Sequence, residues 1–102
     1  MNAKVRSAIV IIALMYSSTL WAHSLLLAVN VNDDCTITVE GVFSSGDPAS
    51  GLEVRLEAPD GRIIAAQDAD AQGVATFKKP SEPYYIVLDG GQGHIVEEEG
   101  PT

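Results

Sequence analysis

The sequence predicts an all-β domain, a small two-sheet antiparallel sandwich of about seven strands. Apolar residues alternate with polar ones along short runs, turn-forming residues separate these runs, and no window has the apolar period of an amphipathic helix. The expected strands are residues 24–31, 35–43, 52–58, 63–67, 74–78, 84–88 and 94–98.

The turns between these strands carry the residues that tight turns need. They lie at residues 32–34, 59–62, 68–73, 80–83 and 90–93. In the turn 59–62, Pro59 presets φ and Gly61 is free to take a positive φ. In the strand before it, Val54 and Leu56 alternate with charged residues, which indicates one buried and one solvated face. An immunoglobulin-like sandwich over 23–98 with a frayed tail at 99–102 is therefore expected; a small open barrel is the alternative.

Residues 1–22 have the composition of a secretory signal peptide. Lys4 and Arg6 form a basic start, an apolar stretch follows, and a small residue, Ala22, stands at the expected cleavage point. The apolar stretch is shorter than the ~20 residues of a membrane-spanning helix. We expect a periplasmic or secreted protein that begins at His23 and has no stable membrane insertion. An uncleaved N-terminal anchor is the alternative.

The charge balance excludes one class of partner. The chain has 14 acidic and six basic residues, and cleavage would remove two of the basic ones, leaving four against 14 and a formal charge of −10. Such a surface repels phosphate backbones, so nucleic-acid binding is not expected. The single Cys35 forms no internal disulfide, and its alternation with Ile37 and Val39 predicts a buried core thiol. A soft metal ligand or an intermolecular disulfide is the alternative for this thiol.

Two resemblances follow from longer stretches. Residues 46–54, the Pro-Asp-Gly turn with its flanks at 58–62, and residues 70–77 resemble, in this order, the carboxypeptidase-regulatory, transthyretin-like module. Ala22-His23, residues 38–44 and the close at 86–94 are similar to small exported auxiliary components of energy-coupling-factor nickel/cobalt transporters. The first resemblance implies a sandwich fold. The second implies an accessory role in metal uptake beside membrane transporter components.

Strand alternation brings the two histidines of the chain together. In an antiparallel sandwich the starts of the first and seventh strands lie at one end, so His23 and His94 share a pole with four aspartates, Asp47, Asp68, Asp70 and Asp89. A mature N-terminal His23 offers an amine and an imidazole, which, with the His94 imidazole, suit borderline divalent metals. The alternatives are a hydrogen-bonded histidine at a strand start and aspartates that only form turns.

The sequence thus predicts a non-catalytic metal-binding protein. No nucleophile motif or glycosidase-like carboxylate pair is present, and no organic cofactor is expected. The metal ligands are His23 and His94, the metal is nickel, cobalt or copper, and the role is capture or handover during nickel/cobalt uptake. A transthyretin-like structural or interaction module and a periplasmic copper-binding protein are the alternatives.

Overall fold

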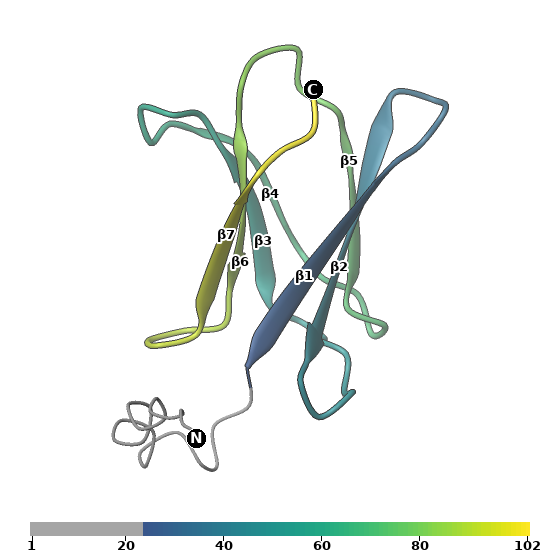
Figure 1. The fold of residues 1–102 in the computed structure, drawn as a ribbon, viewed down its shortest axis with the longest axis vertical. Coiled ribbons are helices and arrows are strands. Elements are labelled where there is room, and N and C mark those ends of the chain that lie inside the picture. The colour runs from purple at the N-terminus through teal and green to yellow at the C-terminus, as the bar shows by residue number, and fades with distance from the viewer. Residues whose placement is uncertain (1–23) are drawn as a thin grey trace, which may run out of the picture.

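The computed structural model describes residues 24–102 as seven antiparallel strands in two sheets (Figure 1). The strands are β1 (Leu25–Val31), β2 (Thr36–Phe43), β3 (Glu53–Glu57), β4 (Ile63–Asp68), β5 (Val74–Lys78), β6 (Tyr85–Asp89) and β7 (Ile95–Glu99). The expectation of an all-β domain of seven antiparallel strands in two sheets is confirmed, and each predicted strand end lies within one residue of an observed one. The expected signal peptide and His23 lie outside the described residues. No helix in the described part of the chain is long and apolar enough to cross a membrane.

The two sheets face each other as layers. One has three strands in the order β1-β2-β5, and the other has four in the order β4-β3-β6-β7. The chain changes sheet between β2 and β3, between β4 and β5, and between β5 and β6 (Figure 1). The two interior strands of the larger sheet, β3 and β6, pair with each other over five residues, from Glu53 opposite Asp89 to Glu57 opposite Tyr85. This pairing joins residues 28 to 36 positions apart in the chain.

The core lies between the sheets and is built by the strand alternation. The largest side chains without solvent exposure come in pairs, two each from β2, β3 and β6: Ile37, Val39, Val54, Leu56, Ile86 and Leu88. Burial of each such side chain contributes about 1.5–3 kcal/mol. A one-residue slip in strand pairing would turn these side chains away from the facing sheet, so their burial fixes the register of each central strand with its neighbours.

Close backbone contacts join two loops at one end of the sandwich. The amide of Gly41 donates to the Gly73 carbonyl at 2.8 Å, and the amide of Ala49 donates to the Gly41 carbonyl at 3.0 Å. Gly73 is buried and has a φ of +79°. A Cβ at this position would lie 2.5 Å from the Gly41 carbonyl oxygen, so the loop after β4 reaches β2 only because residue 73 has no side chain.

The prediction of a buried Cys35 is wrong. The thiol is exposed, and residue 35 is the one non-glycine residue between 24 and 102 with a positive φ, at 69°. The turn after β1 closes when the Asn32 amide donates to the Thr36 carbonyl, so β2 starts one residue after Cys35. The alternation with Ile37 and Val39 therefore breaks before it reaches Cys35, which lies in the turn at the end of the sandwich.

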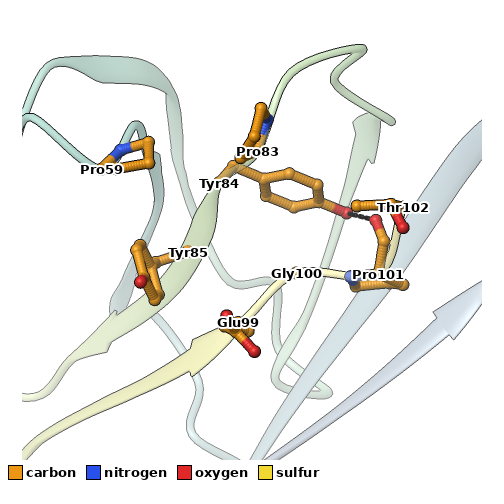
Figure 2. A pocket seen from close by; sticks show the side chains of 8 residues that line it. All are labelled: Pro59, Pro83, Tyr84, Tyr85, Glu99, Gly100, Pro101 and Thr102. Carbon is orange, nitrogen blue, oxygen red and sulfur yellow. Dashed lines mark hydrogen bonds between the residues drawn. The ribbon is translucent and has the colours of Figure 1, made fainter.

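The tail 99–102, expected to fray, is instead held against Tyr84. Glu99 closes β7, and the amide of Gly100 donates to the Tyr84 carbonyl at 2.8 Å. The Tyr84 hydroxyl donates to the Pro101 carbonyl at 2.7 Å (Figure 2). A Cβ on Gly100 would overlap the Tyr84 ring, so the glycine lets the tail cross this aromatic face. No pattern in the sequence marks this contact.

Tyr84→Phe should loosen the tail and leave the sandwich intact. Losing one hydrogen bond to a carbonyl is expected to cost about 1 kcal/mol of unfolding free energy. Amide hydrogen exchange of residues 99–102 should accelerate while that of β3 and β6 changes little. Tyr85→Phe is the matched control, because the Tyr85 hydroxyl bonds to none of the described residues. Equal effects of both variants on the tail would contradict the assigned role of the Tyr84 hydroxyl.

Candidate functional site

The start of β1 and three loops lie at the same end of the molecule. The loops are those between β2 and β3, between β4 and β5, and between β6 and β7, at the lower end in Figure 1. This arrangement follows from strand alternation, because successive antiparallel strands return to the same end. Among the predicted site residues, the structure places His94, Asp47, Asp68, Asp70 and Asp89 at this end. His23 lies outside the described residues.

His94 is exposed and stands directly before β7. A tight turn holds its backbone: the His94 amide donates to the Gly91 carbonyl at 2.9 Å, and its carbonyl accepts from the Gly90 amide at 2.8 Å. Gly91 and Gly93 take φ values of +98° and +81°, which side-chain-bearing residues rarely adopt. Within residues 24–102 the imidazole has no hydrogen-bond partner.

The first residues of β1 pack against this turn. A Cβ built on Gly90 would lie 3.3 Å from Leu25 Cδ2 and 3.3 Å from the His94 Cβ. Leu25, Gly90 and His94 are therefore neighbours. In the sequence, His23 precedes Leu25 by only two positions. The polypeptide enters the described fold beside His94.

The aspartates at this end are largely engaged in other interactions. Asp70 Oδ1 accepts from the amides of Gln72 and Val74, at 2.9 and 3.0 Å, and so closes the β4–β5 loop. Asp47 contacts the Ser45 hydroxyl at 3.2 Å. These are the turn-forming roles that aspartate has next to glycine and proline. Among residues 24–102, no three His, Cys, Asp or Glu side chains converge as a metal site would require.

Asp89 belongs to an ionic cluster that sequence reasoning missed. Arg55 lies at the centre of the outer face of the four-stranded sheet, with a side chain only 18% exposed. Its guanidinium donates to the carboxylates of Glu53 and Glu57, each at 2.9 Å, and to Asp89 at 2.8 Å. The Glu-x-Arg-x-Glu pattern of residues 53–57 could have shown two of these partners, because residues two apart share a strand face. The third depends on the β3–β6 register.

The cluster also shapes the turn before His94. The hydrogen bond from Arg55 holds the pKa of Asp89 below its ordinary value, and a second bond from the Gly91 amide, at 2.9 Å, acts in the same direction. The same three carboxylates raise the pKa of Arg55, so the guanidinium stays charged. Arg55 therefore fixes Asp89, and Asp89 fixes Gly91. Asp89 is a positioning residue here, with both oxygens already accepting hydrogen bonds.

A shallow pocket lies at the opposite end of the sandwich. It has a volume of about 280 Å³ and lies beside Tyr84 and the tail that crosses it (Figure 2). Its position among the β3–β4 and β5–β6 turns separates it from His94 by the length of the strands. Small-molecule sites are usually larger than this, at ~300–1,000 Å³. The pocket is therefore no part of the candidate metal-binding end.

The chain matches no protein-family model, no curated protein and no solved structure.

Proposed function

We propose that this protein is an exported, non-enzymatic metal-binding protein that serves divalent transition-metal uptake. Its ligands are His23 and His94, as predicted from the sequence, and its cargo is nickel or cobalt. The observation that carries the proposal is that Leu25 lies close to Gly90 and His94, because it brings the chain into the fold near an exposed histidine.

The ligand chemistry suits capture and release. After cleavage behind Ala22, His23 supplies its imidazole and its α-amine, whose ordinary pKa of ~7.7–8.0 lets a metal displace the proton near neutral pH. His94 supplies a third nitrogen. Such a set leaves coordination positions open, and a ligand from a transporter component can enter there and take the metal. The acidic surface raises the local concentration of cations.

A second candidate function comes from a different class. Asp70 and Asp89 hold their own turns through hydrogen bonds, which favours a structural or interaction module in which the histidines have no ligand role.

Copper binding is a variant of the first proposal that uses the same nitrogen ligands and differs only in the metal. Cu²⁺ binds nitrogen ligands more tightly than Ni²⁺ or Co²⁺ does.

Metal titration of the mature protein, with its N-terminus confirmed by mass, tests the proposal. We expect Ni²⁺ and Co²⁺ to bind at one site. His94→Ala and a form with one extra residue before His23 should each weaken binding by more than tenfold, since loss of even an outer-shell partner typically costs about 10–100-fold. Gln92→Ala, an exposed change in the same loop, is the control. Unchanged affinity in the extended form would exclude the amine, and unchanged affinity in His94→Ala would exclude the imidazole.

A further inference from the structure

The two sheets have four edge strands, and three of these edges carry features that hinder pairing with another strand. An open edge presents unpaired amides and carbonyls to other chains, and proteins blunt it with charge, irregularity or cover. On β7 the last three residues are glutamates, 97–99. The ladder of β4 with β3 shifts register between Leu56 and Glu57, and on the β5 edge the Gln67 side chain occupies the Thr76 carbonyl at 2.7 Å. The β5 edge also ends in a lysine, Lys78.

The fourth edge, β1, has neither charge nor irregularity. Its sequence, Leu-Leu-Leu-Ala-Val-Asn-Val, contains no charge and no proline. Its ladder with β2 runs unbroken from Leu25 opposite Phe43 to Val31 opposite Ile37. Leu26 is 50% exposed and Val31 is 53% exposed. The strand order β1-β2-β5 places β1 at one edge of its sheet. Although β1 lies near β7 of the facing sheet, among the described strands its edge is distinguished by the absence of charge, proline and a register shift.

The hydrogen bonds at the two ends of the ladder show which backbone groups are free. Ser44 donates to the Ser24 carbonyl, and Asn32 donates to the Thr36 carbonyl. In an antiparallel pair, alternate residues bond to the partner strand. The even-numbered residues of β1 therefore face β2. The amides and carbonyls of the odd-numbered residues point to the open edge: Leu25, Leu27, Val29 and Val31.

We propose that β1 pairs with β1 of a second copy of this chain, antiparallel about a twofold axis at Ala28. In this register Leu25 stands opposite Val31 of the second copy, and Leu27 stands opposite Val29. All four are outward-bonding residues, so every free amide and carbonyl of the strand gains a partner. The two three-stranded sheets become one continuous six-stranded sheet.

The side chains fit this register on both faces. The odd-numbered residues lie on the core side, where Leu27 and Val29 are half-buried at the margin of the apolar cluster. Each inner pair is thus apolar against apolar, and the second strand covers the exposed Val31. On the outer face the axis passes between two copies of Ala28, at the close ~4.5 Å Cα spacing of a non-hydrogen-bonded pair. A small residue suits that spacing.

Charge favours a second copy over a basic partner. A basic protein would be drawn to the acidic surfaces, such as that of β7, and not to an uncharged strand. Two copies of the mature chain, each with four basic and 14 acidic residues, repel one another over long distances, so their pairing should tighten with added salt. A complex held by opposite charges would weaken. The proposal does not rest on metal binding.

Disulfide trapping tests both the interface and its register. In a Cys35→Ser background, Ala28→Cys should form a disulfide-linked dimer, because ~4.5 Å lies within the Cα spacing of disulfides. Thr76→Cys is the control, exposed on the outer face of the same sheet at β5. In the proposed register, Leu26 of one copy stands opposite Asn30 of the other. Leu26→Cys alone should therefore not cross-link, but a mixture of Leu26→Cys and Asn30→Cys proteins should. Cross-linking of Thr76→Cys as readily as Ala28→Cys would overturn the proposal.

Sedimentation equilibrium of the protein with its native sequence gives an independent readout. The dimer fraction should rise with concentration and with NaCl, and Ala28→Lys should abolish it. The lysine faces Glu40 across the β1–β2 ladder, so the protomer should keep its fold and thermal midpoint. A monomer at every concentration and salt level would overturn the proposal. So would protection of the Leu27 and Val29 amides in a monomer, because another segment would then cover the edge.

Discussion

Replacing Gly73 with alanine is expected to cost about 3 kcal/mol or more of unfolding free energy. A residue with a Cβ pays about 1–2 kcal/mol at a left-handed φ. The new Cβ would also lie 2.5 Å from the Gly41 carbonyl oxygen and 2.9 Å from the Ala49 amide nitrogen. Both are backbone atoms, so relief requires the β2–β3 or β4–β5 loop to move. A domain of this size has only about 4–12 kcal/mol in total, and urea unfolding would register the change.

Gly61→Ala separates the two causes. Gly61 has a φ of +91°, similar to that of Gly73, but nothing lies within 4 Å of its absent Cβ. This variant should lose only the ~1–2 kcal/mol of backbone strain. If the two variants unfold at the same urea concentration, the close approach of the loops does not restrict residue 73.

Arg55→Met should destabilise the protein by about 1–3 kcal/mol at pH 7. The guanidinium makes three charged hydrogen bonds on a sheet face where it is mostly buried, and its loss leaves three carboxylates facing one another. Methionine keeps an apolar stem over Val87, the residue opposite Arg55 on β6, so the packing changes little. The amide of Gly91 should also exchange faster, because Asp89 then loses its anchor.

The cost of Arg55→Met should shrink as the pH falls. The pKa of Asp89 is lower in the folded protein than its ordinary value. The stability that this shift contributes is therefore present above the unfolded pKa of about 3.9 and is lost as the pH falls through the folded value. Thermal midpoints of the two proteins should converge below about pH 4. Arg62→Met, which removes an exposed pair with Glu82, is the control and should change little at any pH. A pH-independent difference for Arg55→Met would assign its effect to packing.

The sequence alone supported the strand pattern well. Val54 and Leu56 alternate with charged residues, and the prediction of one buried face follows because a strand turns successive side chains to opposite sides. Turn chemistry set the ends: the proline-aspartate-glycine turn at 59–61 stops β3 after Glu57. These signals are local, and each needs only a few neighbouring residues.

Local signals failed where the chain leaves its strands. The alternation through Cys35 looked continuous, but the bond between Asn32 and Thr36 closes the turn and moves residue 35 out of the sheet. The expected fraying of the tail rested on its composition, yet Tyr84, 17 positions upstream, supplies the hydroxyl that holds Pro101. Both outcomes depend on partners that the pattern around the residue does not name.

The sequence by itself determined an antiparallel β-domain and, through strand parity, which end receives His94 and the start of β1. Only the tertiary structure decided which carboxylates are engaged and which edge is open. Asp89 meets Arg55 because β3 and β6 pair in one register out of several that alternation allows. The exposure of the β1 edge depends on the order of strands in the sheet, and that order follows from how the two apolar faces pack together across the core.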